Sequence, residues 1–436
     1  MSEYRTTTSR RRWAAVALSL LAALLVAGAC APDPGMGGTT TTSTPSTTTS
    51  TTTTSTTTTA PPPTEVRVAT GGFHACLFTK FGSPDLTRCW GGNLQGQVGD
   101  GTVGTSGLAT CCVALNPVDV SGLSTVLDMS LGNQHSCALT TARHVACWGD
   151  DASGQVGDAG TGIVTTPYTI DGLNDVVSLD AGASHTCAVP GDHTVACWGS
   201  NSAGQLGGGL NGAGPGPLTV VNVADATAVS AGIDHTCAIR TGGTVSCWGG
   251  NGLGQLGNGT TTSSSSPVTV DGLTGATQVV TGRAFSCALV GQGVKCWGRA
   301  INLGNGTATN SSVPVDVTGL PAVSKISAAD NHTCALLVDT TVKCWGSSSD
   351  GALGNDTLGS SLTPVSVLSP VDLTPLTGFL DVSAGSNFTC GVRGYGVVTY
   401  PLTCWGRARE GQTGAGFAGA ASSPLPGTFF GQFVNP

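Results

Sequence analysis

The sequence predicts an all-β fold, a seven-bladed β-propeller, on three observations. One motif recurs seven times between residues 65 and 436, with a period near 50 residues. Each copy contains four short β-type segments, and no segment has helical periodicity. Glycine accounts for 66 of the 436 residues and charged residues for only 10%, a composition that disfavours helices with charged faces. Four-stranded repeats of this length are typical of propeller blades.

The tryptophans mark the register of the repeat. Seven of the eight tryptophans recur 48 to 60 residues apart, and they are Trp90, Trp148, Trp198, Trp248, Trp297, Trp345 and Trp405. The remaining one, Trp13, lies in the N-terminal segment. A fixed period of this kind indicates a repeat array, so the length of the chain does not require several separate domains.

The clearest copy of the repeat spans residues 231–270. It reads Ala-Gly-Ile-Asp-His-Thr-Cys-Ala-Ile at 231–239 and Val-Ser-Cys-Trp-Gly at 245–249, with a Gly-Gly turn between them that predicts a hairpin. Asn-Gly-Leu-Gly-Gln-Leu-Gly follows at 251–257. Pro-Val-Thr-Val at 267–270 then predicts a third strand that starts at its proline. The stretch before each Ala-Gly pair predicts the fourth strand.

Residues 1–29 predict an export signal. Three arginines at 10–12 precede an apolar run at 13–29, which is the order of a signal peptide and is short for a bilayer span. Small residues before Cys30 resemble the lipobox of bacterial lipoproteins, and this resemblance implies that Cys30 is acylated. The same small residues also fit an ordinary signal-peptidase site, and an uncut N-terminal anchor is a third interpretation.

Residues 30–64 predict a disordered Thr/Ser/Pro-rich stalk. Residues 39–59 contain sixteen Thr, four Ser and one Pro, which cannot bury apolar surface to offset chain entropy. Such tracts are typical of extended, often O-glycosylated stalks, and a plain flexible linker is the simpler interpretation. With the export signal, the stalk predicts a propeller at 65–436 that is secreted or lipid-anchored at the surface of a bacterial cell.

Three recurring motifs carry a family resemblance. Ala-Gly-x-x-His-[Thr/Ser]-Cys-Ala-Leu, x-Cys-Trp-Gly and Asn-x-x-Gly-Gln-Leu-Gly resemble the regulator of chromosome condensation repeat, a seven-bladed β-propeller family, over all of residues 65–436. A propeller must close, because an open one exposes sheet edges. Residues 65–68 supply a strand with no preceding repeat, and residues 423–426 supply the last one. We therefore expect the two terminal strands to meet in one shared blade.

Fourteen of the 17 cysteines pair by position within the repeats. Each pair lies on the facing strands of a hairpin, within disulfide reach, and the pairs are Cys76 with Cys89, Cys137 with Cys147, Cys187 with Cys197, Cys237 with Cys247, Cys287 with Cys296, Cys334 with Cys344 and Cys390 with Cys404. Because cysteine and tryptophan are adjacent on one strand, they should point to opposite faces of the blade. We interpret Cys111 and Cys112 as a vicinal bridge, with a metal or intermolecular role left open. Lipidation of Cys30 would leave an even number of cysteines.

A histidine recurs at one position of the repeat. It stands at His74, His135, His185, His235 and His332, and Phe285 and Phe388 replace it in the other two copies. The phenylalanines break any sevenfold set of metal ligands. The pattern therefore predicts a structural role, with imidazoles bonded to neighbouring backbone.

No motif for a catalytic, cofactor or metal site stands out. The G-x-G-x-x-G matches at 99–104 and 207–212 open no helix. The turns at 100–101, 258–259 and 305–306 lack the acidic alternation of a calcium loop. We predict no catalytic residue, no cofactor and no metal.

Three segments depart from the repeat, at 101–116, 365–380 and 392–403. Such departures map to loops that often bind partners, although long insertions are also tolerated without function. The third contains Tyr395 and Tyr400, our candidate partner-binding residues, because loop aromatics suit interfaces. A net charge of −8 argues against a nucleic-acid partner.

These observations predict a non-enzymatic binding module outside the cell. We expect a monomer that presents a propeller face to a protein or glycan and meets the membrane only through its N-terminal lipid or signal. The alternative is an inhibitor or regulator of an extracellular enzyme, which the resemblance permits because some secreted bacterial propellers of this family inhibit β-lactamases. Export and acidity disfavour the guanine-nucleotide exchange activity of the eukaryotic namesake. An enzyme would require acidic residues gathered at the axis of the ring.

Overall fold

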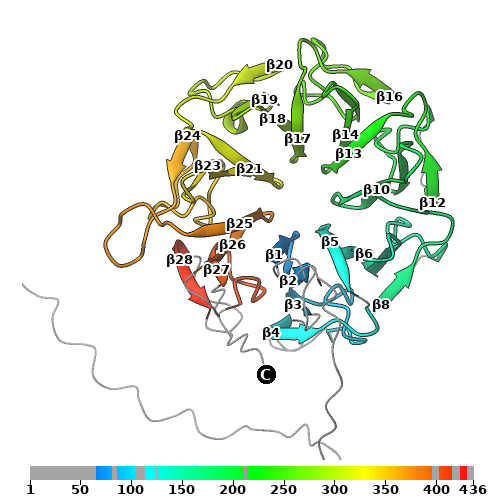
Figure 1. Ribbon diagram of the computed structural model, residues 1–436, viewed down its shortest axis with the longest axis horizontal. Coiled ribbons are helices and arrows are strands. Elements are labelled where there is room, and N and C mark those ends of the chain that lie inside the picture. Colours follow the sequence, from blue (N-terminus) through cyan, green and yellow to red (C-terminus); the bar gives the residue numbers. More distant parts are fainter. Residues whose placement is uncertain are drawn as a thin grey trace, which may run out of the picture. The chain divides into compact units, whose positions relative to one another are not determined.

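The residues that the structure describes form a ring of seven four-stranded antiparallel blades (Figure 1). The structure is a computed structural model that describes residues 65–80, 86–104, 113–123, 125–160, 162–210, 212, 214–394, 402–414 and 423–429. Each blade contains four consecutive strands, so blade 1 is β1–β4 and blade 7 is β25–β28. The first two blades also share one parallel bridge, between Lys80 and Val126.

The strands take four equivalent positions from the axis to the rim (Figure 1). The innermost strands are β1 (Glu65–Thr70), β5 (Val126–Leu131), β9 (Ser178–Ala181), β13 (Ala226–Ala231), β17 (Ala276–Thr281), β21 (Val323–Ala328) and β25 (Phe379–Ala384). The second strands are β2 (His74–Lys80), β6 (His135–Thr140), β10 (His185–Val189), β14 (His235–Arg240), β18 (Phe285–Val290), β22 (His332–Leu337) and β26 (Phe388–Arg393). The third strands are β3 (Thr87–Gly92), β7 (Val145–Asp150), β11 (Ala196–Gly199), β15 (Val245–Gly249), β19 (Gly293–Gly298), β23 (Val342–Gly346) and β27 (Leu402–Gly406). The outermost strands are β4 (Val113–Asp119), β8 (Ile163–Thr169), β12 (Gly214–Thr219), β16 (Ser264–Thr269), β20 (Ser311–Asp316), β24 (Ser361–Ser366) and β28 (Ser423–Phe429), and one 3₁₀ turn, η1 (Ala300–Asn302), follows β19.

The expectation of a shared terminal blade is wrong. Strand β1 pairs with β2 and is the innermost strand of blade 1, whereas β28 pairs with β27 and is the outermost strand of blade 7. The ring closes without strand exchange because β1 already completes a four-stranded blade. Blade 7 and blade 1 meet through side chains, and Val68 and Trp90 of blade 1 pack with Phe388 and Val392 of blade 7.

Each blade carries one disulfide between its second and third strands. The structure joins all seven predicted pairs, with Sγ–Sγ distances of 2.05 to 2.14 Å. The register explains the pairing, because each cysteine lies directly opposite its partner, as Cys237 does to Cys247. Closing a loop of about ten residues in this way stabilises the fold by about 2–3 kcal/mol in the entropic model.

Cysteine and tryptophan face opposite neighbours, as the alternation of the strand requires. Cys237 Sγ lies 3.7 Å from Ser286 Oγ in the following blade. Trp248 Nε1 instead donates to the carbonyl of Gln205 in the preceding blade at 2.8 Å. All seven repeat tryptophans are fully buried and donate in this way, to the carbonyls of Gln412, Gln97, Gln155, Gln205, Gln255, Asn302 and Ala352 in chain order.

The Asn-x-x-Gly-Gln-Leu-Gly loop presents that carbonyl to the next blade. In blade 4 the Oδ1 atom of Asn251 accepts from the backbone N–H of Leu256 at 2.9 Å, which closes the loop. The last glycine of the motif must lack a side chain. At Gly99, which has a φ of +78°, a Cβ atom would lie 2.5 Å from Nε1 of Trp148.

The repeat prolines lie within the outermost strands and not at their starts. Pro267, for example, is the fourth residue of β16, beyond a register shift in its pairing with β15. Proline is tolerated there because an edge strand leaves N–H groups that no neighbour needs. No helix among the described residues is long and apolar enough to cross a bilayer.

The connections alternate between the two ends of the ring. One end, the motif end, carries the turns from the first to the second strands and the loops from the third to the outermost strands. The other end, the hairpin end, carries the turns between second and third strands and the links from one blade to the next. Every loop can therefore be assigned to an end from its place in the strand order.

Candidate functional site

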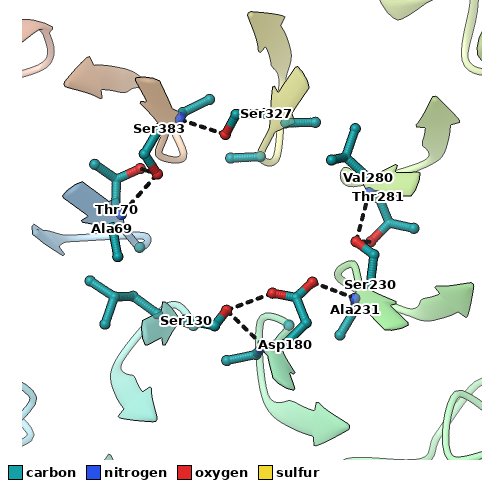
Figure 2. A pocket seen from close by; sticks show the side chains of 18 of the residues that line it. Ala69, Thr70, Ser130, Asp180, Ser230, Ala231, Val280, Thr281, Ser327 and Ser383 are labelled. Atoms are coloured by element: carbon teal, nitrogen blue, oxygen red, sulfur yellow. Dashed lines mark hydrogen bonds between the residues drawn. The ribbon is translucent and has the colours of Figure 1, made fainter. Parts of the chain in front are cut away.

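A channel of about 230 Å³ follows the axis of the ring and is lined by the innermost strands (Figure 2). Each of these strands has an unpaired edge, which would be a liability if its backbone groups had no partners. In six of the seven joints, a side chain of one blade accepts a hydrogen bond from a backbone N–H of the next, at 2.8 to 3.1 Å. These bonds join Ser130 to Ala181, Asp180 to Ala231, Ser230 to Thr281, Gln278 to Ile326, Ser327 to Ala384, and Ser383 to Thr70.

Acidic side chains gather at this axis, as the enzyme alternative would require. Asp128, Asp180 and Asp381 all line the channel. Asp381 forms an ion pair with Lys325 and accepts from the backbone N–H of Val68 at 3.1 Å. Asp128 is exposed toward the channel, but protein surrounds its carboxyl closely, and this desolvation raises its pKa. Burial likewise raises the pKa of the Asp180 carboxyl. Asp180 and Asp381 thus hold neighbouring strands together.

The recurrent histidines are buried between the blades. Each Nε2 atom bonds to a serine or threonine hydroxyl of the following blade, at 2.7 to 3.0 Å. The pairs are His74 with Ser136, His135 with Thr186, His185 with Thr236, His235 with Ser286, and His332 with Thr389. Each hydroxyl in turn donates to the same backbone carbonyl that accepts the hydrogen bond from the tryptophan Nε1 of that blade. The expectation of bonds from the imidazoles to backbone is wrong, because each Nε2 atom bonds to a side-chain hydroxyl.

This network assigns the tautomer of the imidazoles. Because the hydroxyl hydrogen is directed to the carbonyl, each histidine must donate from Nε2. In His74, His135, His185 and His332 this leaves Nδ1 as an unprotonated acceptor, whereas Nδ1 of His235 lies 3.5 Å from Oδ1 of Asp234. Burial favours the neutral ring, and it lowers the pKa of His74, His135 and His185 to about 3 and that of His332 to about 4. These four histidines therefore act as neutral links between blades.

A cluster of exposed aliphatic side chains lies at the hairpin end of blades 6 and 7. We call it the apolar ridge, and it comprises Val338, Val371, Leu373 and Leu380, whose exposed fractions are 57%, 91%, 50% and 53%. Two of these residues lie on the link 367–378 between β24 and β25, which projects from the ring (Figure 1). Single exposed aliphatic residues are ordinary on a protein surface, whereas a group of them on one loop and adjoining segments is a candidate interaction site.

The structure brings together two of the three segments that depart from the repeat. The backbone N–H of Gly394 donates to the carbonyl of Gly378 at 2.9 Å, and Arg393 Nε donates to that of Thr377 at 2.9 Å. The segments 365–380 and 392–403 therefore adjoin at the hairpin end. The third, 101–116, belongs to the connection between β3 and β4 and so starts at the motif end.

The link 367–378 has an internal structure of its own. It is about twice as long as its counterparts 220–225, 270–275 and 317–322. Leu368 and Pro375 form an isolated antiparallel bridge, and the N–H of Ser369 donates to the carbonyl of Thr374 at 2.8 Å. These bonds hold Val371 and Leu373 at the tip of a closed turn, in contact with solvent.

Several residues singled out in the sequence lie outside the described residues. They are Cys30, Cys111, Cys112, Tyr395 and Tyr400, together with the signal segment and the stalk. The aliphatic residues of the apolar ridge were missed individually, since the only signal for them was the length of segment 365–380. The acidic residues of the channel were also missed, because the residue type at their positions changes from one repeat to the next.

Comparison with known proteins supports the fold. The family model described as RCC1-like domain matches residues 28–391. The crystal structure of human WBSCR16 is 22% identical, with a TM-score of 0.64, and the match covers 76% of this chain and 88% of that one. Prp20p from Saccharomyces cerevisiae is 21% identical, also with a TM-score of 0.64, and the match covers 78% of this chain and 85% of that one. The curated proteins contain no match to the sequence.

Proposed function

The chain belongs to the RCC1-like domain family, and from that premise we propose that it is a non-enzymatic binding module whose partner is a protein. Propellers of this family are generally protein-interaction modules. The structure of Prp20p is titled with its binding properties to Gsp1p and histones, and a second yeast structure shows Prp20 bound to Kap60. Those partners belong to the yeast protein, and they support only the general role.

The observation that carries the proposal is the apolar ridge. Val371 is 91% exposed on a loop whose backbone is closed by its own hydrogen bonds. A preorganised apolar loop binds with a small loss of conformational entropy. Aliphatic side chains offer no hydrogen bonds to sugar hydroxyls, which favours a protein over a glycan. We propose that the ridge is the centre of the contact, and we keep Tyr395 and Tyr400 as candidate partner-binding residues from the sequence.

We further propose that the protein acts outside the cell. The predicted signal at residues 1–29, the lipobox cysteine Cys30 and the predicted stalk at 30–64 support export and anchoring. The seven intra-blade disulfides support it too, because disulfides of this density are rare in reducing compartments. Intact mass of native material, before and after reduction, would reveal cleavage, acylation and the number of disulfides.

The binding role can be tested by capture with the full chain. Biotinylated protein is crosslinked to envelope and secreted proteins of its own host, and the retained partner is identified and re-bound in purified form. The double variant V371D/L373D should weaken that binding at least tenfold, because two charges would be buried at the centre of the contact.

The matched control is Leu210→Asp, since Leu210 is 79% exposed but lies on the loop between β11 and β12 at the motif end. It should bind like the unmodified chain. Equal binding by all three proteins would place the contact elsewhere. If the partner is an enzyme, its activity in the presence of the propeller distinguishes an inhibitor from a passive binding module.

A further inference from the structure

One copy of the repeat loop carries a buried carboxylate where others carry an amide. Asn93, Asn201 and Asn251 occupy the first position of the Asn-x-x-Gly-Gln-Leu-Gly loop in blades 1, 3 and 4, and Asp151 occupies it in blade 2. All four accept a loop N–H through Oδ1, which in blade 2 is the N–H of Val156 at 2.6 Å. The exchange therefore preserves the fold of the loop and changes only the second side-chain atom.

In blades 1, 3 and 4 that second atom is an amide nitrogen, which donates to acceptors around it. Asn251 Nδ2 bonds to the carbonyls of Thr260 and Thr262 at 3.1 and 2.9 Å and to Oδ1 of Asn258 at 3.4 Å. Asn201 Nδ2 likewise bonds to the carbonyls nine and eleven residues further on, those of Leu210 and Gly212, both at 2.9 Å. The amide is thus held inside a cage of oxygen atoms.

Blade 2 has the same loop spacing but no amide at this position. The corresponding positions, seven, nine and eleven residues after Asp151, are Asp158, Gly160 and Gly162. Asp151 is fully buried, and its Oδ2 atom has no hydrogen-bond partner among the described residues. The carboxyl of Asp158 lies close enough to interact with that of Asp151. Two carboxylates and backbone carbonyls therefore replace an amide surrounded by acceptors.

We propose that Asp151 and Asp158 bind a calcium ion through their carboxylates, with backbone carbonyls of the described loop residues 151–160 and 162 as further ligands. Calcium takes oxygen ligands from carboxylates, carbonyls and water in flexible geometry, whereas magnesium demands a strict octahedron and keeps its water. A buried, unpaired carboxylate is costly unless a cation compensates it. Asp158 is only half-buried, which leaves the ion a path from solvent.

The proposal uses fewer acidic groups than a full carboxylate cluster. Within the described parts of the chain, no three His, Cys, Asp or Glu side chains converge as metal ligands. The cage supplies the remaining oxygens from its backbone. The turns at 100–101 and 258–259 stay outside this proposal, because the loop before each begins with Asn93 or Asn251 rather than an acid. The turn at 305–306 stays outside it too, because residues 299–304 contain no acid.

A proton is the competing occupant of the cage. Burial, and after it the neighbouring carboxyl of Asp158, raises the pKa of Asp151 to about 7. A protonated Asp151 could donate to a cage oxygen as the asparagine amide does. The experiment must therefore separate calcium from a proton.

The test is titration of Ca²⁺ into the chelator-treated full chain at pH 7.5, by calorimetry and by thermal unfolding. We expect one site with a dissociation constant of about 10⁻⁴–10⁻³ M, as in other weak calcium modules, and a higher Tm with calcium. Asp151→Asn restores the residue of the other blades, so it should fold, lose the site and unfold at a Tm that no longer depends on calcium. Asp158→Asn should weaken binding roughly tenfold or more through the loss of one carboxylate ligand.

Asp100→Asn is the matched control. Asp100 stands seven residues after Asn93 in blade 1, as Asp158 does after Asp151, and its substitution removes the same charge. It should bind calcium like the unmodified chain. The proposal fails if no binding occurs up to about 10 mM Ca²⁺, above the range of such sites, or if D151N binds as well as the unmodified chain. It also fails if Mg²⁺ binds more tightly than Ca²⁺, or if only pH, and not calcium, moves the Tm difference between D151N and the unmodified chain.

Discussion

At the residue scale, the joints between blades match histidine to hydroxyl with two informative exceptions. Phe388 precedes blade 1, where Ala75 stands in place of the hydroxyl residue. Phe285 precedes blade 6, where Thr333 retains a hydroxyl that is buried and has no partner in the described structure. One joint has thus lost both members of the pair, and the other has lost only one.

The unpartnered hydroxyl predicts an unusual mutational effect. Thr333→Val should leave the free energy of unfolding unchanged or raise it, because it removes a buried polar group that makes no bond. Thr236→Val should lower it by about 1–3 kcal/mol, since that hydroxyl bonds to both His185 and the carbonyl of Gln205. Urea unfolding of the two variants provides the comparison. Equal losses would mean that the hydroxyl of Thr333 has a partner in solution.

The buried histidines also predict how stability depends on pH. The pKa of His74, His135, His185 and His332 in the folded state lies near 3 or 4, below the ordinary value of 6.5, so the unfolded chain binds more protons between these limits. This contribution to stability is complete above about pH 6.5 and is lost as the pH falls toward 3. The carboxyls of Asp128, Asp180 and Asp330, whose pKa is raised by burial, act in the opposite sense.

A single substitution isolates the histidine contribution. His74→Phe places at blade 1 the residue that blades 5 and 7 already use, and it removes the bond to Ser136. We expect lower stability than the unmodified chain at pH 7 but a smaller loss on going to pH 4. Thermal unfolding across that range measures both effects. Parallel pH profiles for the two proteins would contradict the low pKa of His74.

At the element scale, the last glycine of the repeat loop limits how closely two blades approach. Gly99→Ala combines backbone strain with a collision against Trp148, whereas Gly122→Ala has only strain, since Gly122 has a φ of +72° with open space around it. We expect a loss of about 1–2 kcal/mol for Gly122→Ala and a clearly larger loss for Gly99→Ala. Chemical unfolding compares them, and equal losses would show that the joint can yield.

Elements were predictable from the sequence where each repeat is self-sufficient. The cysteine pairing, the hairpins and the fold depend on residues that recur, such as Cys237 and Trp248, so the pattern identified them. The grouping of strands into blades did not follow from the pattern, because a period of 50 residues does not determine which of the four strands is the first of a blade. Asp151 was readable as one acid among asparagines, but its significance needed the cage of the other blades.

The candidate site was less predictable for a physical reason. The channel acids and the apolar ridge depend on positions brought together by the ring, and each differs from one repeat to the next. Asp381 illustrates this, since its carboxylate accepts a hydrogen bond from the backbone N–H of Val68 across the joint between the last and first blades. A repeat pattern reports what the copies share, whereas binding depends on where they differ.

At the scale of the whole molecule, the joint between blades 7 and 1 is special because no chain link crosses it. Ser383 bonds there to both the N–H and the hydroxyl of Thr70, while Ser327 makes one such bond, to Ala384, across the covalently linked joint of blades 6 and 7. Ser383→Ala should therefore accelerate unfolding more than Ser327→Ala, by about 1 kcal/mol of activation free energy for the additional bond. Stopped-flow unfolding in urea measures the two rates, and a faster rate for Ser327→Ala would contradict this role of the joint.

The completeness of each blade has a consequence for how such a chain can change over time. Since β1–β4 and every later set of four strands are uninterrupted in the sequence, a genetic crossover between two blade boundaries would transfer an intact unit with its own disulfide. A propeller that splits one blade between its two termini would lose that freedom at its seam. Duplication or deletion of whole units is therefore open to this architecture at any point around the ring, including its ends.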